Sequence, residues 1–296
     1  MSASSARPLV RLVLLRHGEA EGNRELRYLG SGAAGDVALT ARGAAQARQA
    51  AQALAGYPLV AIYASPLRRA WLTANALADA TGLAPQPAPD LREQDYGAWE
   101  GLTRAEAQAR NPALHAAWEA GDDGAPPGGE SQSQLRARVV ACADALAARH
   151  LASPPTPPQS PASPSGQAQA GAVADTRSLA SPDTPIAPTP MIALVSHVGP
   201  IKALIAAALG LAPAEARRLL ARMWLDPASV CVVDWWPATT RGDAALTTPT
   251  TPTTPGDVAP DAPTLTGDGA ALMEPRGLLR VFNATDHLDP PPRWRG

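Results

Sequence analysis

Cysteine, aromatic residues and net charge are all scarce in this chain of 296 residues. Its two cysteines, Cys142 and Cys231, are too few for a disulfide framework, and neither lies in a spacing that would bind a metal. We therefore expect two buried, reduced thiols. The formal net charge of −2 gives no indication of a general affinity for nucleic acid or an anionic membrane surface, although a local cationic site remains compatible with it.

Long hydrophobic runs are also missing. The apolar stretch at residues 9–15 is interrupted by Arg11 and followed by Arg16, so it does not resemble a signal peptide. The most apolar later stretch, residues 201–213, is too short to span a bilayer and carries Lys202. We expect a cytoplasmic protein with no membrane partner.

Proline is abundant by contrast, with 32 residues in the chain. Two segments, residues 152–190 and 238–270, are rich in Pro, Ser, Thr, Ala and Gly and lack apolar periodicity, which predicts long flexible insertions. Without them the chain has an ordinary size for a single α/β domain spanning residues 1–296. Such segments can also adopt polyproline II and bind other domains, so an interaction protein is an alternative function. We favour a spacer role because no arginine or lysine flanks the stretch "SPPTPPQSP".

The rest of the chain alternates between short apolar runs and amphipathic stretches. This alternation predicts a mainly parallel sheet with helices on both faces. The expected strands are residues 9–15, 59–65, 191–197 and 229–236. The expected helices are residues 39–56 with Thr40 as N-cap and Gly56 as stop, 67–82 ending at Gly82, 128–150, and 199–210.

Polar residues stand at the ends of two of these strands. Arg16 and His17 follow the first strand, and His197 ends the third. In an open parallel sheet the ligand crevice lies beyond the carboxyl ends of the strands, so these side chains are expected at a common site.

Five motifs occur in the order typical of one enzyme family. They are "RHGEAEGN" from residue 16, "SPLRRAWLTA" from residue 65, "LREQDYGAWEG" from residue 91, "PPGGES" from residue 126 and "VSHVGP" from residue 195. Together they resemble the histidine phosphatase superfamily, also called the phosphoglycerate-mutase-like family. The resemblance implies an α/β fold, a three-layer α/β/α sandwich with a doubly wound, mainly parallel sheet.

The resemblance implies a phosphohistidine mechanism without metal or cofactor. His17 would be the nucleophile, with its second ring nitrogen held by a backbone carbonyl, and Glu93 would protonate the leaving alkoxide and later take a proton from water. A phosphate dianion requires a cluster of donors around it. The resemblance places the donors at Arg16, Arg69 and His197, with Gly18 and Asn23 as further substrate-binding residues. The family pattern Ser-Pro-Leu-x-Arg-Ala selects Arg69 rather than Arg68.

Two departures from the family pattern leave the reacting groups in place. Ala20 stands where threonine is frequent, and "SHVGP" replaces the commoner Ser-His-Gly-Gly, which changes the loop behind His197.

The closest resemblance is to α-ribazole-phosphatase-type and broad-specificity phosphatases, whose substrates are small phosphorylated metabolites. The alternative is a 2,3-bisphosphoglycerate-dependent phosphoglycerate mutase. The segment between Glu93 and "PPGGES" is short, lacks paired arginines and carries Asp122 and Asp123, which favours a phosphatase. The sequence gives no indication of the oligomeric state.

The leaving group is expected beside residues 24–36 and 95–130. Tyr96 and Trp99 are candidates to flank an aromatic or sugar moiety there, with core packing as an equal alternative for Trp99.

Overall fold

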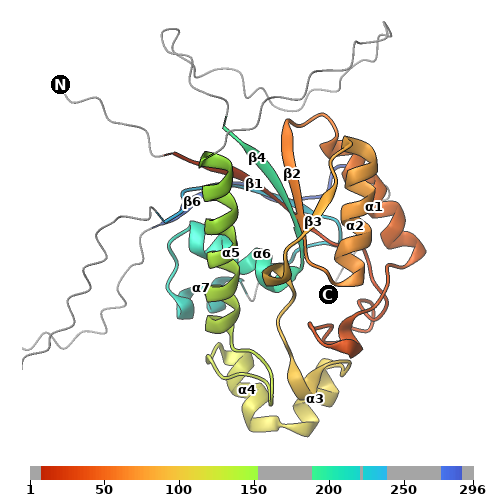
Figure 1. The fold of residues 1–296 in the computed structure, drawn as a ribbon. Coiled ribbons are helices and arrows are strands. Elements are labelled where there is room, and N and C mark those ends of the chain that lie inside the picture. Colours follow the sequence, from red (N-terminus) through yellow and green to blue (C-terminus); the bar gives the residue numbers. More distant parts are fainter. Residues whose placement is uncertain (1–7, 153–188, 221–222, 239–274, 289–296) are drawn as a thin grey trace, which may run out of the picture.

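The computed structural model describes residues 8–152, 189–220, 223–238 and 275–288. The insertions expected at 152–190 and 238–270 lie outside the described residues except at their ends. Figure 1 shows a central sheet with helices on either side and a smaller helical part below it.

The sheet has six strands in the order β3-β2-β4-β1-β5-β6. Strands β1, β2, β3 and β4 run parallel to one another, whereas β5 pairs antiparallel with both β1 and β6. The predicted α/β class and mainly parallel sheet are confirmed, with an antiparallel edge in addition. The strands are β1 (Val10–Arg16), β2 (Leu59–Ala64), β3 (Pro85–Pro87), β4 (Met191–Ser196), β5 (Val230–Trp235) and β6 (Gly277–Ala284).

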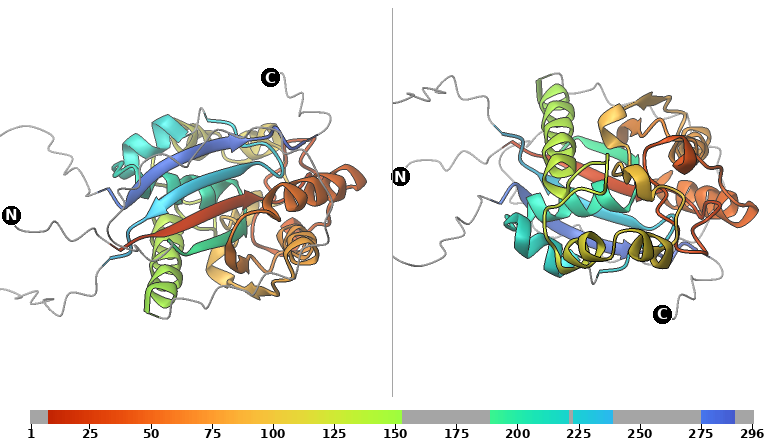
Figure 2. Two further views of the ribbon diagram at one scale, coloured as in Figure 1. Left: turned by 90° about the horizontal axis from the view of Figure 1, so that it is seen from above. Right: turned by 90° about the horizontal axis from the view of Figure 1, so that it is seen from below.

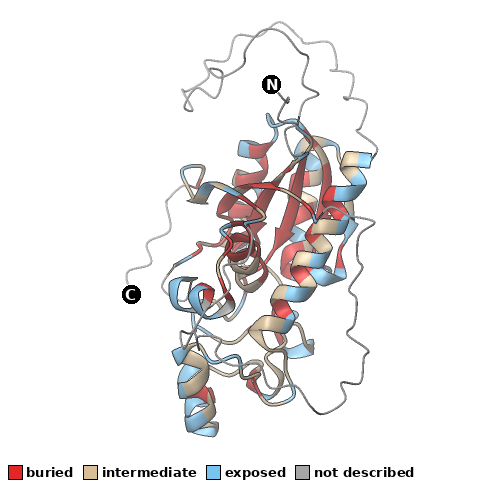
Figure 3. Cartoon of the chain, turned by 90° about the vertical axis from the view of Figure 1, so that its left-hand side faces the viewer, coloured by how far each residue is buried: buried red, intermediate tan, exposed pale blue. Residues whose placement is uncertain are grey.

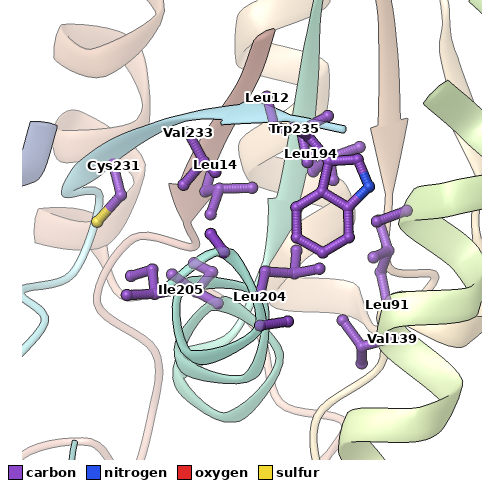
Figure 4. Packing of buried hydrophobic residues seen from close by; sticks show 14 of the residues in the cluster. Leu12, Leu14, Leu91, Val139, Leu194, Leu204, Ile205, Cys231, Val233 and Trp235 are labelled. Atoms are coloured by element: carbon purple, nitrogen blue, oxygen red, sulfur yellow. The ribbon is translucent and has the colours of Figure 1, made fainter. Parts of the chain in front are cut away.

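Alternate side chains of β1 point into two separate cores. Leu12 and Leu14 pack in the core on one face of the sheet, and Val13 and Leu15 pack in the core on the other face. The first core includes residues of α5 (Gln132–Ala152) and α6 (Val198–Ala208), the second residues of α1 (Ala41–Leu54) and α2 (Arg68–Thr81). Figure 4 shows part of the first core, where Trp235 lies among leucines of the strands and of α6. The interior is therefore built as three layers, and the strands are its most buried part (Figure 3).

The expected helices are present with shifted ends. Thr40 caps α1 by accepting the Gly43 N–H at 3.0 Å, but α1 ends at Leu54, two residues before the expected stop at Gly56. Gly82 ends α2 in the left-handed conformation, where glycine is favoured. Helix α5 begins four residues later than expected.

Several elements were not predicted. Strands β3 and β6, α7 (Pro213–Leu220) and the 3₁₀ turns η1 (Ala33–Gly35), η2 (Pro89–Leu91) and η3 (Gly97–Trp99) are short or weakly patterned. Helices α3 (Arg104–Arg110) and α4 (Pro112–Ala120) lie at one end of the sheet, below it in Figure 1 and in front of it in the right-hand panel of Figure 2, where the molecule is seen from below. Helix α3 has a capping box in which Thr103 and Glu106 satisfy each other's backbone groups.

The cysteine prediction holds for one residue of the two. Cys231 is buried on β5, but Cys142 is only half-buried because it lies beside, and not on, the buried face of α5. Both thiols are free, and burial raises their pKa values to about 11.

Candidate active site

Two histidines meet at the carboxyl ends of neighbouring strands. In the parallel pairing of β1 and β4, Arg16 lies opposite Ser196, and the His17 N–H donates to the Ser196 carbonyl at 3.0 Å. His17 and His197 follow directly, and their ring centroids are 5.1 Å apart. Strand register alone therefore brings together two residues that are far apart in sequence.

The hydrogen bonds of His17 define its tautomer. Its Nδ1 lies 2.7 Å from the Gly18 carbonyl, which can only accept, so Nδ1 carries the proton. Its Nε2 lies 3.3 Å from Nε of Arg69, which can only donate, so Nε2 presents a lone pair. Burial and the nearby Arg69 and Arg16 hold the pKa of His17 well below its usual value. The imidazole is thus neutral, with a nucleophilic nitrogen turned toward an arginine.

Arg69 is fixed by backbone carbonyls as well as by His17. Its guanidinium donates to the carbonyls of Leu29, at 2.9 Å, and of Gly30 and Gly35. The side chain of Arg69 is buried, whereas that of Arg68 is exposed, and the binding of phosphate by Arg69 stays a prediction.

Arg16 is buried beside the same histidine. One of its guanidinium nitrogens donates to the Leu225 carbonyl, while its Nε is buried and has no hydrogen-bond partner within the described part of the chain. Burial is the main reason that the pKa of Arg16 is lowered to about 10. Among the described residues, Arg16 and Arg69 make no salt bridge with a carboxylate. Two buried cations without such a partner favour an anionic ligand.

His197 completes this group from the end of β4. Its Nε2 lies 2.8 Å from Oγ of Ser65, and its Nδ1 is buried with no hydrogen-bond partner among the described residues. Burial, Arg69 and His17 hold its pKa well below the usual value. Ser65 belongs to the "SPLRRA" motif, but its contact with His197 was not predicted.

Glu93 lies in a loop that the surrounding elements hold in place. The Ser196 hydroxyl donates to the Leu91 carbonyl at 2.7 Å, and Arg138 of α5 donates to the carbonyls of Asp90 and Arg92 at 2.7 and 3.1 Å. Arg138 in turn forms a salt bridge with Glu130 of the "PPGGES" motif at 2.7 Å. This motif therefore positions the loop that carries Glu93.

The carboxylate of Glu93 is buried and accepts two backbone N–H groups. Its Oε1 lies 2.9 Å from the Gln94 nitrogen and 3.1 Å from the Gly199 nitrogen. Burial raises the pKa of Glu93, and these hydrogen bonds, together with Arg69 and Arg16, limit the rise. A raised pKa suits a group that must carry a proton before it acts as an acid.

Gly18 shapes the loop after His17. Its N–H donates to Thr73 Oγ1 at 3.1 Å, and a Cβ on Gly18 would lie 2.2 Å from the Gly43 carbonyl oxygen. The loop can pack against α1 only because both positions are glycine. The backbone N–H of Gly18 is therefore engaged within the protein, and substrate binding by Gly18 stays a prediction.

Asn23 turns the same loop and reaches a cavity. Its Oδ1 accepts the Ala20 N–H at 2.8 Å, which leaves its amide NH₂ as the donor for a ligand.

A cavity of about 480 Å³ opens beside Arg16. The cavity is bordered by the expected segments, through Leu26, Arg27 and Tyr28 on one side and Tyr96, Arg104 and Trp118 on the other. Helices α5 and α6 contribute further lining residues that were not predicted, among them Gln132, Arg136 and Lys202.

The two candidate aromatic residues differ in their placement. Tyr96 lines the cavity, whereas Trp99 is fully buried and its indole N–H donates to Asn111 at 2.9 Å. Trp99 is thus a core residue, and Tyr28, Trp118 and Trp224 are the additional aromatic residues at the cavity. The rings of Tyr28 and Tyr96 pack against each other in a tilted arrangement, with centroids 4.9 Å apart.

The chain belongs to the histidine phosphatase superfamily. The profile of branch 1 of this superfamily matches residues 12–153. A solved mycobacterial glucosyl-3-phosphoglycerate phosphatase, described in complex with VO3, is 32% identical, covers 77% of this chain and 92% of its own, and superposes with a TM-score of 0.58. The family implied by the motifs is thereby confirmed.

Two further relatives represent the other activities considered above. A 2,3-bisphosphoglycerate-dependent phosphoglycerate mutase of Methylobacterium radiotolerans is 42% identical over 138 residues, which are 44% of this chain and 63% of the relative. The structure of a candidate α-ribazole-5′-P phosphatase from Escherichia coli K-12 is 26% identical, covers 76% of this chain and 90% of its own, and has a TM-score of 0.56. The matches span between 35% and 66% of the length of the curated relatives.

The described residues form neither a membrane-spanning helix nor a metal-binding cluster. No helix in this part of the chain is long and apolar enough to cross a membrane. The same residues hold no group of three or more His, Cys, Asp or Glu side chains arranged to bind a metal ion.

Proposed function

We propose that the protein is a phosphomonoesterase that hydrolyses small phosphorylated metabolites through a phosphohistidine on His17. The observation that carries this proposal is the neutral His17, whose Nε2 faces the Nε of Arg69 at 3.3 Å beside a second buried cation, Arg16. A phosphoryl group between these residues would have a nucleophile on one side and charged donors around its oxygens.

In the first half of the reaction, Nε2 of His17 attacks phosphorus and the bond to the ester oxygen breaks. Arg16, Arg69 and His197 bind the phosphoryl oxygens, and Glu93 gives its proton to the departing oxygen. The raised pKa of Glu93 supports this role because the acid must be protonated when substrate binds.

In the second half, the Glu93 carboxylate takes a proton from water as that water attacks the phosphorus of phospho-His17. The nitrogen–phosphorus bond breaks, and inorganic phosphate and neutral His17 are released. The Gly18 carbonyl holds the Nδ1 proton throughout, so that Nε2 is ready for the next substrate.

Hydrolysis is favoured over mutase activity by the segment that follows Glu93. It is short and carries Asp122 and Asp123, which would repel a retained bisphosphorylated intermediate. The relatives include both phosphatases and a mutase, so activity must decide between them. The α-ribazole and sugar phosphates are the first substrate candidates. A cytoplasmic location, a single domain and a spacer role for the Pro-rich segments stay predictions.

The test is a panel of phosphorylated metabolites with p-nitrophenyl phosphate as reference. We expect release of inorganic phosphate from several esters, and from 3-phosphoglycerate no 2-phosphoglycerate with or without 2,3-bisphosphoglycerate. His17→Ala is expected to lower kcat by at least about 10⁴-fold while far-UV circular dichroism is unchanged. Isomerisation that depends on the bisphosphate would support the mutase instead, and retained turnover in His17→Ala would contradict the proposal.

A further inference from the structure

The chain contains a single lysine. Of its 25 basic residues, 24 are arginines and the one exception is Lys202. Lysine differs from arginine in being a compact point charge with three donors on a flexible stem. Arginine occupies all the remaining basic positions, so Lys202 is the one residue of the sequence whose side chain ends in an ammonium group.

Lys202 lies on the face of α6 that borders the cavity. Val198, Gly199, Lys202, Ala203 and Ala206 all line it, a spacing that falls on one side of a helix. The N–H of Gly199, three residues earlier on this face, donates to the Glu93 carboxylate. The lysine is therefore one helical turn beyond the contact that holds the proposed acid, in the cavity where the leaving alcohol is expected.

The residues next to Lys202 along α6 are apolar. Ile201, Leu204 and Ile205, its neighbours on α6, are buried in the core. Burial is the main reason that the pKa of Lys202 is lowered to about 8, while Glu93 raises it and Arg16 lowers it further. A partly buried ammonium group that borders a cavity is placed to interact with an anion bound there.

The remaining charged residues of the cavity lining are also mainly cationic. Besides Arg16 and Lys202, its described lining contains three arginines and one carboxylate, so cations predominate. Two of the arginines have carboxylate partners of their own, since Arg104 pairs with Glu119 and Arg27 with Glu25. Arg16 and Lys202 thus place positive charge both beside the proposed phosphoryl site and further along the cavity lining.

We propose that Lys202 is a specificity-determining residue that binds a second anionic group, a carboxylate or a phosphate, on the leaving alcohol of the substrate. This inference rests on the proposed phosphomonoesterase function and extends it to a substrate class. Because Lys202 lies one turn from the Glu93 contact, the second anion is expected within a few bonds of the ester oxygen.

A series of three-carbon phosphomonoesters tests this inference. They carry a hydroxyl, a carboxylate or a second phosphate at the far carbon: 3-hydroxypropyl phosphate, the phosphate ester of 3-hydroxypropionate, and propane-1,3-diol bisphosphate. We expect kcat/KM of at least one anionic ester to exceed that of the hydroxyl ester at least tenfold, mainly through KM. Comparison of the two anionic esters identifies which anion is preferred.

Substitution of Lys202 then removes the preference. In Lys202→Met, kcat/KM for the preferred anionic ester is expected to fall at least tenfold more than kcat/KM for the hydroxyl ester, and Lys202→Arg is expected to restore part of the difference. Arg68→Gln is the matched control, because Arg68 is exposed and lies outside the cavity lining. It is expected to preserve the ratio. Equal rates for all three esters in the wild type, or an unchanged ratio in Lys202→Met, would overturn the inference.

A second measurement needs neither turnover nor a variant. Reductive methylation with ¹³C-formaldehyde gives one lysine side-chain signal, because the chain has one lysine. We expect 3-hydroxypropionate to shift the dimethyl-Lys202 signal and propane-1,3-diol to leave it in place.

The measurements also separate this inference from the proposed function. If p-nitrophenyl phosphate and all the other esters are stable, the proposed function fails and the NMR titration alone decides whether Lys202 binds an anion. If the esters are hydrolysed without preference and the signal does not shift, the Lys202 inference fails and the phosphatase proposal stands.

Discussion

Strand β1 carries one arginine near each end, and the two have opposite electrostatic surroundings. Arg11, near the start, forms a salt bridge with Asp234 at 2.6 Å, and the same carboxylate binds Arg280 at 2.5 Å. Arg16, at the carboxyl end, lies beside Arg69 and His17, and burial lowers its pKa although the Glu93 and Asp226 carboxylates attract it. Among the described residues it has no salt bridge with a carboxylate. The charge of Arg11 is thus neutralised within the protein, whereas the buried charge of Arg16 could be neutralised by a bound anion.

The difference separates a structural role from a functional one. The buried carboxylate of Asp234 on β5 lies between Arg11 of β1 and Arg280 of β6. It therefore stabilises the pairing of these three strands. Buried cations without a salt bridge lower the stability of the ligand-free protein, and the proposed binding of a phosphate dianion would account for their presence. Substitutions at the two ends of β1 should therefore affect different properties.

The largest effect is expected at the carboxyl end. Arg16→Gln removes a charged donor to the phosphoryl group, so kcat/KM for phosphomonoesters is expected to fall by about 10²- to 10³-fold. The free energy of unfolding is expected to stay the same or rise, since a buried cation without a carboxylate partner is removed. Steady-state kinetics and urea denaturation measure the two quantities. A large loss of stability with normal kinetics would reverse the roles of the two arginines.

The next effect depends on the leaving group. Glu93→Gln removes the proton donor, so kcat/KM for alkyl phosphates is expected to fall by about 10²-fold. For p-nitrophenyl phosphate, whose leaving group needs little protonation, a much smaller fall is expected. The control is the slope of log kcat/KM against leaving-group pKa, which should become steeper in the variant. Parallel slopes would show that Glu93 is not the acid.

The pH dependence should follow the two shifted groups. The pKa of Glu93 is raised, so kcat/KM for alkyl phosphates is expected to fall as pH rises through that pKa and the acid loses its proton. The pKa of His17 is lowered, so the nucleophile stays neutral well below pH 6.5 and loses activity only at lower pH. Each limb is expected to change about tenfold per pH unit. In Glu93→Gln the alkaline limb should disappear; its persistence would assign that limb to another group.

The smallest effect on catalysis is expected at the start of β1. Arg11→Gln leaves Asp234 with Arg280 alone, so the free energy of unfolding is expected to fall by about 1–2 kcal/mol. The value of kcat/KM should stay within about twofold of the wild type. Because the two variants exchange the same residue types on one strand, Arg11→Gln is the matched control for Arg16→Gln. A kinetic defect as large as that of Arg16→Gln would remove the distinction.

The sequence predicted the part of the fold that is patterned locally. Apolar runs flanked by turns identified β1, β2, β4 and β5, and Thr40 and Gly82 identified the start of α1 and the end of α2. Strand β6 was missed because exposed and half-buried side chains follow one another along it without regular alternation. Strand β5 runs antiparallel to both β1 and β6, and the hydrophobic periodicity of a sequence does not show which strands pair or in which direction.

The candidate site was predicted to a greater extent than its surroundings. Motifs named Arg16, His17, Arg69, Glu93 and His197, and the structure places them around one point. Contacts such as that of Ser65 with His197 depend on side-chain directions at the sheet edge, which no sequence pattern specifies. The contribution of α5 and α6 to the cavity lining was not predicted. Arg136 and Lys202 belong to helices whose apolar pattern is typical of ordinary core helices.

The most direct test of the account is the site of phosphorylation. Rapid quenching of the enzyme with a phosphomonoester, followed by peptide mass spectrometry and ³¹P NMR under alkaline conditions, would locate the phosphoryl group. The account predicts a single phosphohistidine at His17, on Nε2, because Nδ1 is held by the Gly18 carbonyl. Phosphorylation on His197, on Nδ1 of His17, or on no histidine during steady turnover would contradict it.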